Sequence, residues 1–391
     1  MSEFKASGFS DEFGSSGPDI VGLTTFTSPY YFVPPSGSTA ERPSSPPPGM
    51  LRFNTDIGRL EVWRNDHWAT ILGESPNLGD QNNTDSSGGT GTRAVFCRGD
   101  TSGPTVDVNI IDYITVSTLG NAQDFGDDNT TNRQAGALAS STRALIAGRG
   151  SASTAISFIT FASTGNATNF TGTLVSATGG SPAGISNETR GIFAGGIAPG
   201  ATTKMDYVTI ASNSNAQDFG DLSATRDSPF GCASSVRGIV AGGFSPSPGT
   251  KHASIDYITI SSTGNAQDFG DMSSGTDGGS MASNSTRGIF GGGRHSGNAL
   301  INVIEFITIA STGNAQDFGD LLQVRGGGRG AASSTRMVFG GGYQPSSPFN
   351  NFTNGAIEYV EIATTGNGQG FGDLSVNREQ AAGCSNGHGG L

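Results

Sequence analysis

Residues that could do chemistry are few in this 391-residue chain, and they are widely spaced. No HExxH pattern places two imidazoles on one zinc ion. We also find no convincing G-x-S-x-G elbow followed by the acid and histidine of a hydrolase. The sequence therefore predicts a protein that is not an enzyme and that uses no metal or cofactor. The four histidines are His67, His252, His295 and His388.

An Asp-Phe-Gly triplet occurs four times, beginning at Asp124, Asp218, Asp268 and Asp317. The triplet binds metal in protein kinases, but the glycine-rich loop and the strand lysine that accompany it there are missing. We interpret each Phe as a packing residue, each Asp as the cap of a turn and each Gly as a position of positive φ. The alternative is calcium held by paired aspartates. The GGGRG run at 326–330 is interpreted as a turn, because no strand and helix flank it as in a phosphate-binding loop.

Composition points to many short strands joined by turns. The chain contains 62 glycines, and only 14 % of its residues are charged, against the usual share of about 25 %. Its net charge is −12 and its only lysines are Lys5, Lys204 and Lys251, so nucleic acid is an improbable partner. Apolar runs are too short to cross a bilayer and no leader pattern begins the chain, so we expect no membrane insertion.

Three sequence markers recur along the chain and define six repeats. The first is the heptad NAQDFGD, whose copies start 45 to 53 residues apart at Asn121, Asn166 (degenerate), Asn215, Asn265, Asn314 and Asn367 (degenerate). The second is an arginine before a short apolar run and a glycine turn, at Arg93, Arg143, Arg190, Arg237, Arg287 and Arg336. The third resembles IDYITI and begins at Ile111, Ile156, Met205, Ile255, Ile304 and Ile357.

Each repeat is predicted to contain four short strands. In the fourth repeat they begin near Pro229, Arg237, Ser254 and Asn265, with the most variable loop after the Gly-Gly pair. The third of these strands is largely apolar on both faces, so its sheet must be covered on both sides. Repeats of this size and pattern predict an all-β fold, a six-bladed β-propeller.

The two ends of the repeat array complete one blade. The array opens on a second-strand sequence near Gly91, and the chain ends on a first-strand sequence, so residues 381–386 are predicted to close the ring. Cys97 and Cys384 then fall on adjacent strands and are expected to face each other as free thiols. We expect each marker arginine to pair with an acid of its own blade; the alternative is a ring of positive charge around the axis.

The Gly-Gly pair followed by the I-D/E-Y strand resembles the kelch motif over residues 91–391. The kelch tryptophan is absent. Phenylalanines in the heptads take its place as the expected blade-packing residues, namely Phe125, Phe170, Phe219, Phe269, Phe318 and Phe371.

The N-terminal residues differ in composition from the repeats. We predict an extended, proline-rich attachment arm over 1–48, a small β-meander that docks onto a partner over 49–72, a linker over 73–90 and the propeller over 91–391. Two or three strands bury little surface alone, so the meander needs a docking partner or a homo-oligomer. Its predicted docking residues are Phe53, Leu60, Val62, Trp63 and Trp68.

The segment PPGMLRFNTDIGRLEVWRNDHW resembles one found near the N-termini of tail-fibre and related virion proteins of marine and cyanobacterial phages. The resemblance implies a virion protein whose N-terminal region binds other virion proteins and whose C-terminal region faces a host-surface glycan or protein. A tail-fibre or tail-tip protein is the leading expectation. The alternatives are a capsid-decoration or tail-nozzle protein that binds no receptor, and a carbohydrate-active enzyme.

Overall fold

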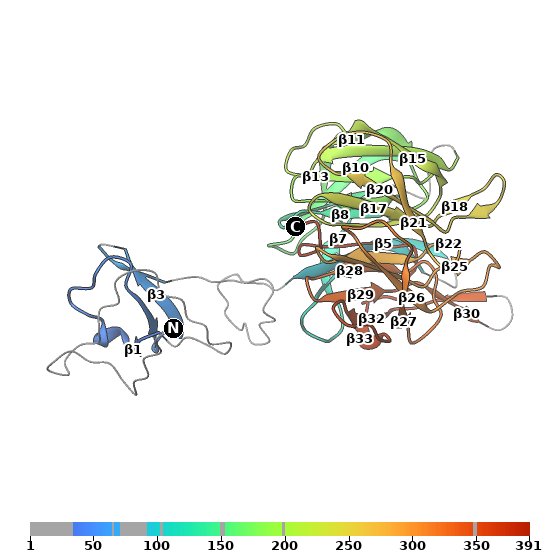
Figure 1. Cartoon of the computed structure of the whole chain (residues 1–391). Helices are drawn as coiled ribbons and strands as arrows, with labels where there is room; N and C mark the ends of the chain where they lie inside the picture. Colours follow the sequence, from blue (N-terminus) through green and yellow to red (C-terminus); the bar gives the residue numbers. More distant parts are fainter. Residues whose placement is uncertain are drawn as a thin grey trace, which may run out of the picture. The chain divides into compact units, whose positions relative to one another are not determined.

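The protein is described by a computed structural model that covers residues 34–64, 66–70, 92–101, 105–148, 153–197, 200–346 and 350–391. The chain divides into two compact units, Met1–Ser75 and Pro76–Leu391. Both units are built from strands, and the only helix among the described residues is the single turn η1 (Thr39–Glu41) (Figure 1). The predicted all-β class is therefore confirmed. The predicted linker lies outside the described residues, as do residues 1–33 of the arm.

The first unit is a four-stranded sheet in the order β1-β2-β3-β4. Its strands are β1 (Ser36–Gly37), β2 (Leu51–Asn54), β3 (Arg59–Trp63) and β4 (Trp68–Thr70). Strands β2 to β4 form the predicted antiparallel meander, and β1 adds to β2 in parallel. Strand β1 comes from the segment assigned to the arm and completes this sheet, so the sheet includes residues on both sides of the predicted boundary at residue 48.

The described part of the second unit contains six four-stranded antiparallel sheets and three short two-stranded ones. We call the strands of each sheet first to fourth in the order in which they lie across it, and name each sheet by its first strand. The first strands are β8 (Gly136–Ala139), β12 (Ala183–Ser186), β16 (Phe230–Ala233), β23 (Ser280–Ser283), β28 (Arg329–Ala332) and β34 (Ala382–Ser385). The second strands are β9 (Arg143–Ala147), β13 (Arg190–Ala194), β17 (Arg237–Ala241), β24 (Arg287–Gly291), β29 (Arg336–Gly340) and β5 (Arg93–Thr101).

The outer two strands of each sheet carry the remaining repeat markers. The third strands are β10 (Ser153–Thr160), β14 (Thr202–Thr209), β20 (Ser254–Thr259), β26 (Val303–Thr308), β32 (Ala356–Glu361) and β6 (Val106–Thr115). The fourth strands are β11 (Thr168–Thr178), β15 (Gln217–Arg226), β21 (Gln267–Asp271), β27 (Gln316–Asp320), β33 (Gln369–Asp373) and β7 (Gln123–Asp127). The four strands predicted for the fourth repeat are those of the β16 sheet.

The β34 sheet joins the two ends of the second unit. Strand β34 pairs antiparallel with β5, so that Ala382 lies opposite Cys97 and Cys384 lies opposite Val95. Cys97 and Cys384 therefore share a face but sit diagonally, and the expectation that they face each other is wrong. Diagonal Cα atoms are about 7–8 Å apart, beyond the reach of an unstrained disulfide. Both thiols are free and buried, and burial raises the pKa of each; that of Cys384 is about 12.

The first strands contact one another in the order β8, β12, β16, β23, β28, β34 and back to β8. Their fourth residues alternate between Ala and Ser around this circuit. Each Ser hydroxyl donates to the carbonyl of the preceding Ala, at 2.5 to 2.7 Å, in the pairs Ser186–Ala139, Ser283–Ala233 and Ser385–Ala332. Only small side chains allow strands to converge this closely, which explains the run of Gly, Ala and Ser at these positions.

The heptad holds each sheet to the next one. The Asn265 side-chain oxygen accepts the Asp221 N–H at 3.1 Å, and the Gly264 N–H donates to the Phe219 carbonyl at 2.7 Å. A Cβ on Gly220 would lie 2.4 Å from the Gly264 oxygen, so this contact requires glycine. Equivalent Asn contacts occur at all six junctions, made by Asn121, Asn166, Asn215, Asn265, Asn314 and Asn367.

The roles predicted for the Gly, Asp and Phe positions of the Asp-Phe-Gly triplets can be compared with the structure. The four glycines have φ between +140° and +149°, as predicted. The Asp124 carboxylate accepts the Gly126 N–H at 3.2 Å, whereas the other three aspartates are exposed and make no such bond within the described residues. The heptad phenylalanines are at most 4 % exposed and meet a third-strand aromatic ring edge-on, with ring centroids 5.9 to 6.4 Å apart.

Within the described part of the chain, the marker arginines do not pair with acids as expected, except that Arg336 contacts Glu361 at 2.6 Å. Each guanidinium instead lies over the third-strand aromatic ring of its own sheet, 4.3 to 4.9 Å from the ring centroid. It also donates to a backbone carbonyl of the next sheet, at 2.6 to 3.2 Å, and the six acceptors belong to Phe161, Ile210, Ile260, Ile309, Ile362 and Ser117. These arginines therefore link neighbouring sheets.

A different set of arginines pairs with acids. Arg98, Arg226, Arg325 and Arg378 are at most 1 % exposed, and each forms an ion pair with a buried carboxylate. Their partners are Asp128, Asp256, Glu358 and Asp112. Burying a cation without a partner is costly, which explains why these four are matched one to one.

Candidate functional site

The sheet of the first unit has two unlike faces. Strand alternation and register place Leu51, Phe53, Leu60, Val62 and Ala69 together on one face, which we call the apolar face. Leu51 is 38 % exposed and the other four are half-buried. No described residue completes the burial of these side chains, so the apolar face is the surface of this unit best suited to docking.

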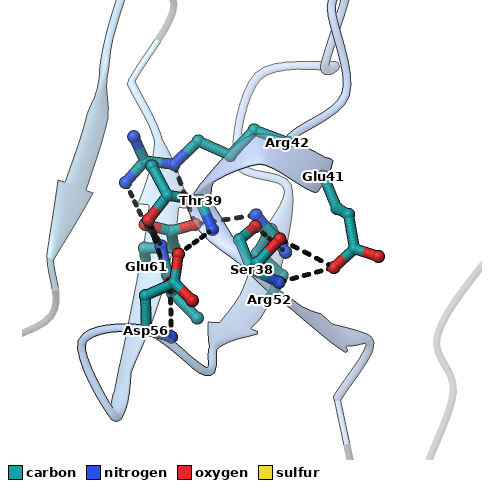
Figure 2. Close-up of polar contacts among 8 residues, drawn as sticks. Ser38, Thr39, Glu41, Arg42, Arg52, Asp56 and Glu61 are labelled. Atoms are coloured by element: carbon teal, nitrogen blue, oxygen red, sulfur yellow. Dashed lines mark hydrogen bonds and ion pairs between the residues drawn. The ribbon is translucent and has the colours of Figure 1, made fainter.

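The opposite face holds a polar cluster around Glu61, which is fully buried. Figure 2 shows Arg42 and Arg52 converging on its carboxylate, with nitrogen–oxygen distances of 2.5 to 3.1 Å. Hydrogen bonds from Arg42 are the main cause of the lowered pKa of Glu61. Because the Arg52 guanidinium also donates to the Ser38 carbonyl at 3.0 Å, the cluster ties the segment around η1 to the sheet.

The structure separates the five predicted docking residues. Phe53, Leu60 and Val62 lie on the apolar face, whereas Trp63 and Trp68 lie on the face of the polar cluster. The two indole rings contact each other with centroids 5.6 Å apart, and the Arg42 and Arg52 guanidinium groups lie about 6 Å from the Trp68 ring. The tryptophans are half-buried, like most of the apolar face, but their contacts are with each other and with the polar cluster.

The second unit has two distinct ends, defined by the direction of its first strands. At their C-terminal end, the chain enters the domain at Thr92, and the last residues fold over the circuit of first strands. The His388 Nε2 lies 2.8 Å from the Ala139 oxygen, and the Gly389 N–H donates to the Ser283 oxygen at 2.8 Å. Behind this tail lies a cavity of about 40 Å³ lined by the six first strands. We call this the entry end.

The variable loops lie at the other end, because they join the ends of second strands to the starts of third strands. They form short hairpins from β18 (Phe244–Ser245) with β19 (Thr250–Lys251) and from β30 (Tyr343–Ser346) with β31 (Asn350–Thr353). A further pair joins β22 (Thr276–Asp277) to β25 (Arg294–His295). Figure 1 shows β18, β25 and β30 on the side of this unit away from the C-terminus. We call this the loop end.

A ring of backbone hydrogen bonds surrounds the centre of the loop end. The residue two positions before each first strand has a φ between +50° and +66°, and four of these six residues are not glycine. Their N–H groups donate around the circle at 2.9 to 3.3 Å. Such conformations cost energy for residues with a side chain, and they persist only where neighbouring bonds impose them. The ring residues are Gln134, Ser181, Ser228, Gly278, Gly327 and Gln380.

Several charged side chains lie beside this ring. Burial is the main cause of a raised pKa at Glu379, to about 7, with a further contribution from Asp100. Asp100 is itself 2 % exposed and pairs with Arg133 at 3.2 Å. Arg329, the first residue of β28, donates to the Ser181 hydroxyl at 2.7 Å, and burial lowers its pKa to about 10. The sequence interpretation of 326–330 as a turn gave no indication of this side-chain arrangement.

The described residues contain no group of three or more His, Cys, Asp or Glu side chains that could hold a metal ion. Among them, no helix has the length and hydrophobicity needed to span a bilayer. No protein-family model and no curated protein sequence matches the chain. The candidate sites therefore rest on geometry: the apolar face of the first unit and the ring at the loop end of the second.

Proposed function

We propose that the chain is a non-enzymatic structural protein of a bacteriophage particle, with the tail fibre or tail tip as the leading location. Its first unit docks onto other virion proteins and favours a homo-oligomer. Its second unit is displayed for recognition of a host-surface glycan or protein. The sequence resemblance of residues 47–68 to phage virion proteins supports this assignment.

We propose further that the second unit is a six-bladed, kelch-like propeller closed by the C-terminal strand. The support is the circuit of contacts among the six first strands, together with the β34–β5 pairing that joins the two chain ends. A closed ring turns the unpaired edges of the first strands toward its axis, where other proteins cannot pair with them. Such a domain suits display outside a particle because it is rigid and resists edge-to-edge aggregation.

One observation carries the functional proposal: in the second unit, the point where the chain enters and the variable loops lie at opposite ends. The chain enters at Thr92 at the entry end, whereas the variable hairpins project from the loop end. A tether at one end leaves the other end free to meet a partner. Variable loops on a rigid scaffold are a common way to build a recognition surface.

The location is tested on intact particles with gold-labelled antibody raised against residues 91–391. Label confined to the tail supports attachment to the host. Label spread over the head instead favours the alternative, a capsid-decoration protein that binds no receptor. Absence of label from purified particles refutes the virion assignment.

Docking through the apolar face is tested with Val62→Asp, which places a charge at the centre of that face. The matched control is Ile57→Asp in the β2–β3 turn, where Ile57 is 45 % exposed and lies off the face. We expect V62D to lose incorporation into particles and I57D to keep it. The chain has two tryptophans, both in the first unit, so their fluorescence reports whether V62D still folds. Normal incorporation of folded V62D refutes docking through this face.

A further inference from the structure

We propose that Arg329 is the core of a binding site for one anionic group, a carboxylate or sulfate ester, of an acidic polysaccharide. The site lies at the centre of the loop end, inside the ring of backbone hydrogen bonds. This inference rests on the proposed function, since it names the ligand class that the displayed end would recognise.

The position of Arg329 follows from its contacts. Its guanidinium belongs to the β28 sheet but donates to the hydroxyl of Ser181, which precedes β12. In the circuit of first strands, β12 and β28 are three steps apart in either direction, so they lie opposite each other. The side chain therefore reaches across the centre of the ring. A second bond, 2.8 Å to the Gly328 carbonyl, fixes its orientation.

Among the described residues, Arg329 has neither the carboxylate partner of the four fully buried arginines nor the aromatic ring that each marker arginine contacts. Arg98, Arg226, Arg325 and Arg378 each contact a carboxylate within 3.0 Å. Within the described residues, Arg329 has no carboxylate within the 4.0 Å limit of an ion pair, and its bonds go to neutral oxygens. It remains partly exposed, so a ligand can reach it. A half-buried cation without an ion-pair partner favours binding of an anion.

Arg329 also breaks the repeat. The equivalent first residues of the other five first strands are uncharged: Gly136, Ala183, Phe230, Ser280 and Ala382. A residue needed only to close the circuit would fit the pattern of these small or apolar neighbours. A residue that departs from the pattern of its repeat, without adding to the stability of the fold, tends to mark a functional position.

The nearby acids give the site a distinctive pH dependence. Glu379 attracts Arg329 electrostatically and faces Asp100, Arg133 and Tyr343 as well. Arg133 already neutralises Asp100, with which it pairs. A bound anion would repel the charged form of Glu379 and favour its protonated form. Anion binding should therefore strengthen as the pH falls from 8 to 6, whereas binding to an isolated arginine would stay constant.

The test is calorimetric titration of the purified full chain with sodium glucuronate, galactose 6-sulfate and neutral galactose. Arg329→Gln should weaken binding of at least one anionic probe about tenfold or more, the effect expected for losing a charge-assisted contact. Arg329→Lys keeps the charge and should retain part of the affinity. Lys204→Gln removes the same charge from an exposed, off-centre side chain and should leave affinity within about twofold of the wild type.

The outcomes separate this inference from the proposed function. Equal binding of anions by the wild type and Arg329→Gln overturns the site, as does equal binding of galactose and the two anionic probes. Failure of both anions to bind also overturns it, while particle labelling and incorporation of V62D are unaffected by these results. Loss of binding in Arg329→Gln alone, with stronger binding at pH 6 than at pH 8, supports it.

Discussion

The buried ion pair between Arg226 and Asp256 offers a quantitative test of how neighbouring sheets are held together. Arg226 ends the fourth strand of the β12 sheet, and Asp256 lies in the third strand of the β16 sheet. The guanidinium is 3.0 Å from the carboxylate, and the two side chains are 0 % and 1 % exposed. Replacing Asp256 with Asn keeps the shape and removes the charge, which leaves the Arg226 cation enclosed without its partner.

The expected loss is about 3–5 kcal/mol, the usual cost of breaking one half of a buried pair. Arg226 keeps its bonds to the Gly242 and Ser254 carbonyls, at 2.8 and 2.9 Å, which favours the lower part of that range. For a domain of this size, each kcal/mol lost from the free energy of unfolding lowers the melting temperature by about 2 °C, so the melting temperature should fall by roughly 6–10 °C. Urea unfolding and scanning calorimetry of the full chain measure both quantities.

The β12 sheet supplies a matched control. Its equivalent acid, Asp206, is 5 % exposed, forms no ion pair within the described residues and accepts the Val175 and Ser176 N–H groups. Burial raises the pKa of Asp206, so neutralising it relieves a desolvation cost. Asp206→Asn retains an oxygen to accept these bonds and should cost less than about 1 kcal/mol.

A double variant separates the charge from the shape. Arg226→Met combined with Asp256→Leu removes both charges, and it should recover at least half of the loss caused by D256N alone. Equal losses for D206N and D256N would refute the reasoning, because only Asp256 has an arginine partner. A double variant as unstable as D256N would also refute it, since the loss would then come from packing.

Three further predictions concern other parts of the second unit. Glu379 has a pKa of about 7 in the folded protein and 4.5 as a free group, so the free energy of unfolding should fall as the pH rises from 4.5 to 7. In urea unfolding, Glu379→Gln should be more stable than the wild type by about 1 kcal/mol at pH 8 and equal to it at pH 4. Removing 381–391 exposes the β5 edge and should produce assemblies larger than that of the full chain in size-exclusion chromatography; a truncated chain with the assembly size and melting temperature of the full chain contradicts this. Gly270→Ala places a Cβ 2.4 Å from the Gly313 oxygen and should cost about 2 kcal/mol or more in thermal unfolding, whereas Gly264→Ala, whose Cβ meets nothing within 4 Å, should cost less.

Much of the fold could be predicted because its elements are local. Alternation and turn residues define the four strands of each repeat, and incomplete repeats at the two ends indicate the β34–β5 pairing. The heptad glycines were identified as positive-φ positions, but their close approach to the next sheet involves a partner 39 or more residues away. That partner depends on how the sheets stack.

The candidate sites were less predictable than the fold. Alternation grouped Phe53 with Trp63 as docking residues, although pairing places them on opposite faces of the sheet. The segment around η1 contains too little apolar sequence to predict a packed element, because ion pairs and hydrogen bonds to Glu61 hold it in place.

The sequence by itself determined the repeat, the all-β class and the four main strands of each repeat, because short-range alternation and turn chemistry decide them. Only the tertiary structure decided which arginines meet acids and which meet rings and carbonyls. It also brought Arg329 to Ser181, 148 residues away, across the circuit of first strands. Such pairings depend on the stacking and twist of whole sheets, which the local sequence pattern does not predict.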